Sequence, residues 1–257
     1  MTAPALISRR LLLAAGAGLI AAPAIAASPH GGKKAPAAPM HPGPGDHAAT
    51  ATLSPEAAMT RLMDGNARYV AAKATHPNAD VARRKLVAAG QHPFAIILAC
   101  ADSRVAPELI FDQGLGDLFV VRVAGNVVDD AILASIEYAV IHLGSPLIMV
   151  LGHERCGAVK ATADALAGQP SDDDKDTKIG ALASLIAPAV NAVPAATVDK
   201  VDAAVSLNAS FTAAEIFAGS RPLRSRVLAG QIKIVAARYD LDDGKVTPAK
   251  GATPTPV

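Results

Sequence analysis

Two short segments of this chain carry side chains that could bind a metal ion and activate water: Cys100-x-Asp102-x-Arg104 and His153-x-x-Cys156. Cysteine sulfur and histidine nitrogen are zinc ligands, and a catalytic zinc site typically has three protein ligands and an open fourth position. Zinc can lower the pKa of a water bound there to about 7, which makes hydroxide available at neutral pH. Asp102 is near enough to the cation Arg104 to stay ionised and to accept a hydrogen bond from that hydroxide. The two segments therefore predict a catalytic zinc site.

The same residues are open to other interpretations. Cys100 and Cys156 are the only two cysteines, so a disulfide between them is an alternative to a metal site. A lone buried cysteine is more often a small apolar side chain than a ligand. Asp102 and Arg104 could equally form an ordinary salt bridge at the end of a strand. The position of these residues in the fold has to distinguish these interpretations.

Short apolar runs alternate with helical patterns along the chain. The runs cover residues 94–99, 118–123, 146–151 and 231–237, and the helical patterns cover 129–143, 156–167, 179–190 and 198–218. Continuous apolar runs are typical of strands buried on both faces, so the alternation predicts an α/β fold with a parallel β-sheet flanked by helices. Ligands of such sheets bind at the carboxyl ends of the strands. Cys100 ends the first run, and His153 and Cys156 come after the third.

Four segments are predicted. Residues 1–27 are predicted to be a secretory signal peptide, 28–53 a spacer rich in Pro, Gly and His, 54–247 one catalytic domain, and 248–257 a flexible tail. Ser54-Pro55-Glu56 has the composition of a helix start. The inward stripe of that helix is expected to contain Leu62, Ala67 and Val70.

The signal segment has a positive start and an apolar middle. Arg9-Arg10 precede the apolar stretch 11–22, and Ala24-Ile25-Ala26 form a small-x-small cleavage site. Ser8-Arg9-Arg10 followed by three leucines resembles a twin-arginine signal. We therefore expect export to the periplasm by the twin-arginine machinery, which carries folded proteins. An ordinary secretory signal and an uncleaved anchor are the alternatives.

The bulk composition excludes a nucleic-acid partner. The formal net charge is +1, aromatic residues make up 3% and there is no Trp, so neither a polyanion-binding surface nor a base-stacking platform is expected. A small-molecule substrate agrees with these values.

A series of motifs resembles the β-class carbonic anhydrases. The motifs are Cys100-Ala101-Asp102-Ser103-Arg104-Val105, Pro107-Glu108, Phe111-Asp112, Gly116-Asp117-Leu118-Phe119-Val120-Val121-Arg122, Ala124-Gly125-Asn126, Glu137-Tyr138-Ala139 and Gly152-His153-Glu154-Arg155-Cys156-Gly157-Ala158-Val159. The likeness runs from about Ser54 to Val246. It implies a parallel sheet flanked by helices, one Zn²⁺ per chain, and reversible hydration of CO₂ to bicarbonate and a proton by metal-bound hydroxide. It also implies a homodimer or homotetramer.

The resemblance assigns roles to particular residues. It implies Cys100, His153 and Cys156 as zinc ligands, Asp102 and Arg104 as the catalytic dyad, and Gln91, Phe119, Tyr138 and Ala124 as substrate-binding residues. Gln91 would donate a hydrogen bond to substrate, and the two aromatic residues would line an apolar CO₂ pocket at the dimer interface.

One subtype of this family closes its site when the counterpart of Asp102 binds zinc and bicarbonate binds beside a Trp. Ile97 stands at the Trp position here, so we expect an always-accessible fourth position. Two other functions stay open: hydrolysis of CS₂ or COS on the same scaffold, and an exported structural zinc-binding module.

Overall fold

The computed structural model describes residues 53–174 and 176–249, and these form a five-stranded sheet in the order β2-β1-β3-β4-β5. The strands are β1 (Ala95–Ala99), β2 (Leu118–Arg122), β3 (Leu147–His153), β4 (Lys233–Tyr239) and β5 (Val246–Pro248). The first four are mutually parallel, which confirms the predicted α/β fold.

β5 was not predicted from the sequence, and the bounds of the predicted strands differ in detail. β5 is antiparallel to β4 because only a short turn joins them, and a tight hairpin requires antiparallel strands. β4 lies two residues further along the chain than predicted, and β3 extends through His153. Pro248 pairs with Ala237, and the N–H of Ala249 donates to the carbonyl of Ala236, so the sheet passes the expected domain end at 247.

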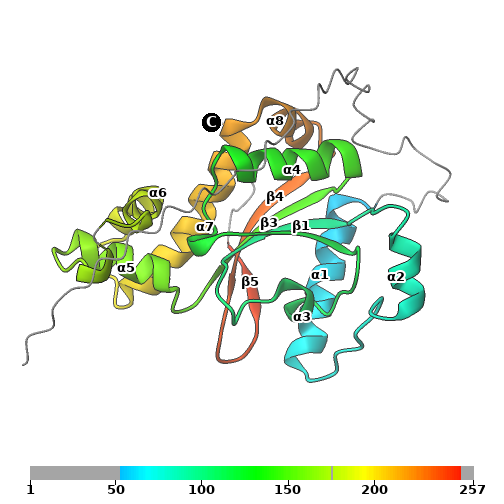
Figure 1. Cartoon of the computed structure of the whole chain (residues 1–257), viewed down its shortest axis with the longest axis horizontal. Helices are drawn as coiled ribbons and strands as arrows, with labels where there is room; N and C mark the ends of the chain where they lie inside the picture. Colours follow the sequence, from blue (N-terminus) through cyan, green and yellow to red (C-terminus); the bar gives the residue numbers. More distant parts are fainter. Residues whose placement is uncertain (1–52, 175, 250–257) are drawn as a thin grey trace, which may run out of the picture. The chain divides into compact units, whose positions relative to one another are not determined.

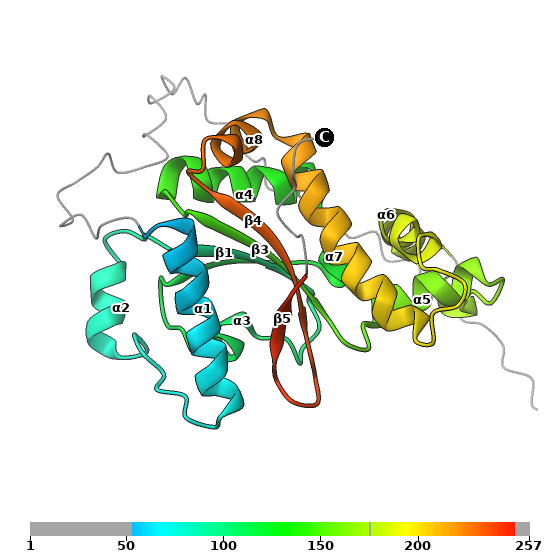
Figure 2. The same ribbon diagram turned by 180° about the vertical axis from the view of Figure 1, so that it is seen from behind.

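Helices cover both faces of the sheet (Figure 1 and, from behind, Figure 2). They are α1 (Pro55–Val70), α2 (Val81–Val87), α3 (Pro107–Ile110), α4 (Asp130–Leu143), α5 (Gly157–Leu166), α6 (Ile179–Asn191), α7 (Lys200–Gly219) and α8 (Arg221–Leu228), with short 3₁₀ turns η1 (Ala124–Asn126) and η2 (Asp172–Asp174). Ile97 and its alternate neighbours on β1 pack with α1 and α3, whereas Ile96 and Leu98 pack with α4, α7 and α8. Because side chains alternate along a strand, this sandwich explains why β1 and β3 are apolar at nearly every position.

Helix α1 begins as predicted, but its inward face differs from the predicted stripe. The Ser54 side chain accepts a hydrogen bond from the N–H of Ala57 at 3.1 Å. Leu62 is buried as expected, whereas Ala67 and Val70 are exposed. The buried stripe instead contains Pro55, Ala58, Leu62, Gly65 and Asn66. A buried polar residue, Asn66, occupies the place that the pattern gave to an apolar one.

The predicted signal peptide 1–27 lies outside the described residues, as does all but the last residue of the predicted spacer 28–53. Within the part of the chain that is described, no helix combines the length and the apolar character needed to cross a membrane.

Candidate metal centre

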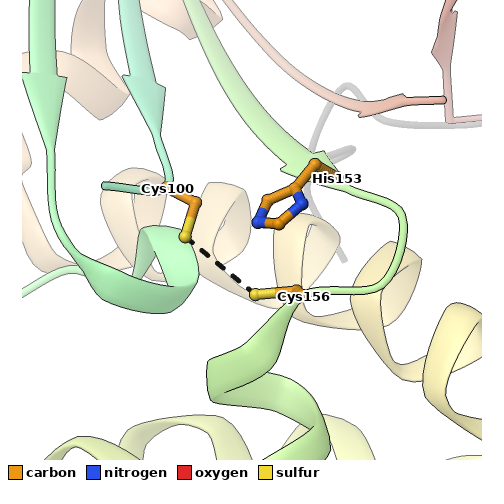
Figure 3. Close-up of side chains that lie close together, drawn as sticks. All are labelled: Cys100, His153 and Cys156. Atoms are coloured by element: carbon orange, nitrogen blue, oxygen red, sulfur yellow. Dashed lines mark hydrogen bonds between the residues drawn. The ribbon is translucent and has the colours of Figure 1, made fainter. Parts of the chain in front are cut away.

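The three predicted ligands come together at the carboxyl edge of β1 and β3 (Figure 3). Cys100 directly follows β1, His153 is the last residue of β3, and Cys156 caps the start of α5. Their potential ligand atoms all lie within 4.8 Å of one another, and all three residues are buried. The parallel pairing of β1 and β3 places the two strand ends side by side, as the sequence predicted.

The cysteine sulfurs are separate thiols rather than a disulfide. The two Sγ atoms are 4.0 Å apart and both cysteines are free, whereas a disulfide bond is about 2.05 Å long. Two sulfurs bound tetrahedrally to one zinc ion at about 2.3 Å are about 3.8 Å apart. The observed separation fits a shared zinc ion and excludes the disulfide alternative in this structure.

His153 presents a buried nitrogen with no partner. Its Nδ1 lies 2.9 Å from the carbonyl oxygen of Glu154, an acceptor, so Nδ1 carries the proton and donates. The Nε2 atom is then left with a lone pair, and it has no hydrogen-bond partner although the side chain is fully buried. Buried polar atoms are rarely left unpaired, and a metal-binding histidine usually donates its other ring nitrogen to a carbonyl in this way. The residues present therefore fit a zinc ion.

The electrostatics of the two thiols also favour a cation. Hydrogen bonding with Cys156 lowers the pKa of Cys100 well below its ordinary value against the effect of burial, and the N–H of Gly125 adds to this lowering. The same hydrogen bond, together with burial, raises the pKa of Cys156 above its ordinary value. Only one of the two sulfurs can ionise readily while they face each other alone. A divalent cation between them would let both become thiolates, with release of a proton.

Asp102 and Arg104 form a two-point ion pair beside the ligands. Arg104 donates from Nε to Oδ1 of Asp102 at 2.9 Å and from Nη2 to Oδ2 at 2.7 Å. These hydrogen bonds hold the pKa of Asp102 well below its usual range. Oδ2 of Asp102 is 3.8 Å from Nε2 of His153. The carboxylate thus faces the ligand set while Arg104 holds both of its oxygens.

Two contacts of Cys100 were not foreseen from the sequence. Arg122 donates to the carbonyl of Cys100 at 3.1 Å and to that of Asp102 at 2.6 Å. The N–H of Gly125 donates to the Cys100 sulfur at 3.3 Å. Arg122 and Gly125 both lie in motifs that carry the family resemblance, and that was the only signal of their importance.

One predicted substrate-binding residue lies beside the metal ligands, and the others lie toward the opposite end of the strands. Ala124 begins η1, next to Gly125 and the Cys100 sulfur. Gln91 precedes β1, and Phe119 pairs with Ile96 in the first half of the parallel strands. Five strand residues rise about 16 Å, so Gln91 lies at the opposite edge of the sheet from the ligands of its own chain.

Tyr138 on α4 lies with Phe119, at a ring-centroid distance of 6.3 Å. These aromatic residues and Gln91 lie away from the metal ligands of their own chain, and their predicted role at a dimer interface stays a prediction. The strand direction is the physical reason, because the length of β1 separates residues before its amino end from residues after its carboxyl end.

Comparisons with known proteins agree with this architecture. The sequence model of the family described as carbonic anhydrase matches residues 95–246. "Carbonic anhydrase 2" of Mycobacterium tuberculosis strain H37Rv is 45% identical over 192 residues, covering 75% of this chain and 91% of that protein. "Carbonic anhydrase" of Mycolicibacterium smegmatis is 42% identical over 196 residues, covering 75% and 92%.

A solved structure, the Coccomyxa β-carbonic anhydrase in complex with acetazolamide, superimposes with a TM-score of 0.55 at 27% identity, covering 77% of this chain and 86% of that one. The chain thus belongs to the carbonic anhydrase family, and its fold is that of the β class. It is accordingly an enzyme of CO₂ hydration.

Proposed function

We propose that the chain binds one zinc ion through Cys100, His153 and Cys156 and uses it to interconvert CO₂ and water with bicarbonate and a proton. The observation that carries this proposal is the unpartnered, buried Nε2 of His153 beside two free sulfurs. Zinc in such a set supplies a nucleophile derived from water near pH 7.

Asp102 is the residue that orients the attacking water. Both of its oxygens accept from Arg104, so the carboxylate stays ionised and keeps one orientation. A hydroxide held between Asp102 and the ligand set could donate a hydrogen bond to the carboxylate, which would direct a lone pair of the hydroxide at the carbon of CO₂. After the carbon–oxygen bond forms, bicarbonate leaves and the proton passes to buffer.

The fourth metal position stays accessible to this water. Arg104 competes for the carboxylate of Asp102, and Ile97 stands where a Trp marks the subtype that closes. An X-ray absorption spectrum of the zinc protein at pH 7 should fit two sulfurs, one imidazole and one water oxygen. A fourth protein ligand instead of water would indicate the closed form, or the structural zinc module that is the alternative function.

A second copy of the chain supplies Gln91, Phe119 and Tyr138 to the site. Their place at the far edge of the sheet supports this, because a Gln side chain cannot span the length of β1. The half-buried Phe119 and Tyr138 would become a closed apolar wall in a homodimer or homotetramer.

Mixing of two variants tests this arrangement. Cys156→Ala lacks the metal site and Gln91→Ala lacks the donor, so a mixed dimer would regain one intact site. Activity above that of either parent is expected after the two chains are unfolded and refolded together. Activity no higher than the average of the parents would place Gln91 outside the site.

The reaction itself is tested by turnover of the zinc-loaded chain on CO₂, CS₂ and COS. Hydration of CO₂ should exceed hydrolysis of either sulfur analogue. The opposite order would assign the chain to the CS₂ or COS hydrolases that share this scaffold.

Export to the periplasm by the twin-arginine machinery completes the proposal, and residues 1–27 support it. Replacement of Arg9 and Arg10 by lysines should retain the protein in the cytoplasm, as judged by cell fractionation. Unchanged periplasmic protein would favour the ordinary secretory route.

A further inference from the structure

Gly125 connects the metal centre to helix α7 through its backbone N–H and its backbone carbonyl. Its N–H donates to the Cys100 sulfur at 3.3 Å, and its carbonyl oxygen accepts from Nδ2 of Asn208 at 2.7 Å. Gly125 and Asn208 are both buried, and Asn208 is only 2% exposed. The side-chain amide of Asn208 on α7 therefore binds the residue that donates a hydrogen bond to Cys100, although Asn208 and Gly125 are 83 positions apart in the sequence.

The position of Gly125 leaves little freedom for any other arrangement. Its φ is +70°, a left-handed conformation that glycine adopts without strain. A Cβ at this position would lie 2.6 Å from Cδ1 of Ile186, which is fully buried on α6. These neighbours confine η1. A contact that holds the carbonyl of Gly125 therefore also restricts the direction of the Gly125 N–H.

The geometry points to Asn208 as a positioning residue for the metal centre: it holds Gly125 so that the backbone N–H stays directed at the Cys100 sulfur. An N–H···S bond draws electron density from a thiolate, stabilises its charge in a buried site and fixes its lone-pair direction. This role rests on the proposed zinc site, since it concerns how Cys100 donates to the ion.

Cobalt(II) in place of zinc provides a readout of the sulfur itself. In Asn208→Ala and the similarly shaped Asn208→Leu, the sulfur-to-cobalt charge-transfer band should move to longer wavelength, because the thiolate becomes a stronger donor. Zinc affinity, measured by competition with a chelator, should fall about ten-fold, the lower end for an outer-shell contact of a metal site.

Asn66→Ala is the matched control. Asn66 is also a buried asparagine on a helix, and its Nδ2 donates to the carbonyls of Ile110 and Gly244, which are not part of the metal centre. This variant should lose stability without a shift of the cobalt band. A shift of equal size in the control, or no shift in folded Asn208 variants, would overturn the proposal.

Two experiments on the wild-type protein distinguish failure of this proposal from failure of the proposed function. If cobalt gives no sulfur charge-transfer band in the wild type, the metal site itself is wrong and the role of Asn208 falls with it. If the band is present, the ¹¹³Cd-substituted protein should show scalar coupling between the metal and the Gly125 amide proton through the Cys100 sulfur. Absence of that coupling would overturn the proposal even if both Asn208 variants fail to fold.

Discussion

Two groups of potential metal ligands lie at the same edge of the sheet, and they differ in how the rest of the chain neutralises them. Among the described residues, Cys100, His153 and Cys156 form one group. All three are buried, no Lys or Arg side chain of the described residues hydrogen-bonds the sulfurs, and Nε2 of His153 has no hydrogen-bond partner. The group is complete only with a cation.

Glu154, Asp240 and Asp242 form the second group, after β3 and β4. Arg155 donates to both oxygens of Asp242 at 2.9 and 2.7 Å, and Arg238 donates to Asp240 at 3.0 Å. Arg238 also lies 3.7 Å from Glu154. A cluster of potential metal ligands therefore indicates a metal centre only where arginine or lysine side chains do not already balance its charge.

Loss of a ligand from the first group should have the largest effect. Cys156→Ala is expected to abolish both zinc binding and CO₂ hydration, because two protein ligands cannot hold the ion in this site. Glu154→Gln, in the second group, serves as the control and should retain one zinc per chain by metal analysis. Full zinc content in Cys156→Ala would refute the ligand assignment.

Removal of the orienting carboxylate should have the next largest effect. Asp102→Asn keeps the size of the side chain but removes its charge, so hydration should fall between about ten- and a hundred-fold while zinc is retained. Stopped-flow hydration and metal analysis on the same sample would measure this. Loss of zinc together with activity would show that Asp102 is a ligand rather than an orienting residue.

Arg238 offers a test within the second group. Its guanidinium donates to Asp202 at 2.7 Å as well as to Asp240, so Arg238→Met should lower the free energy of unfolding by about 2 kcal/mol. Denaturant unfolding would measure the loss, and zinc content should not change. A fall in zinc content would mean that the two groups are coupled.

The smallest effect should depend on pH. Hydrogen bonds from Arg155 lower the pKa of Asp242 in the folded protein, so ionised Asp242 favours folding. This contribution is complete above the ordinary pKa of about 3.9 and is lost as the pH falls through the folded value. Unfolding of wild type and Asp242→Asn should therefore differ at pH 7, and the difference should shrink as the pH falls below the ordinary pKa of the carboxyl group. A difference that grows on acidification would contradict the sign.

The approach of the three residues could be predicted from the sequence because Cys100 ends one apolar run, His153 and Cys156 follow another, and parallel strands bring such ends together. The proposed role of Asn208 could not be predicted, because it depends on how the backbone of Gly125 is held by a contact 83 positions away. The proposal that Gln91 serves the site of a second chain likewise required knowing at which end of β1 it lies.

The misassigned stripe of α1 has a different cause. Ala67 is apolar but follows Leu62 by five residues, which is about 140° around the helix and off its inward face. The buried face instead follows the helical period through Ala58, Leu62 and Gly65. It also contains Asn66, whose amide bonds Ile110, Gly244 and Val246, and a polar residue of this kind is not found by hydrophobic periodicity.

The most direct test of the proposed zinc chemistry is CO₂ hydration measured on one sample before zinc removal, after it, and after one equivalent of zinc is returned. We predict fast hydration that disappears with the metal and returns with it. Slow hydration at one bound zinc per chain, or fast hydration of the zinc-free protein, would contradict the proposed role of the metal.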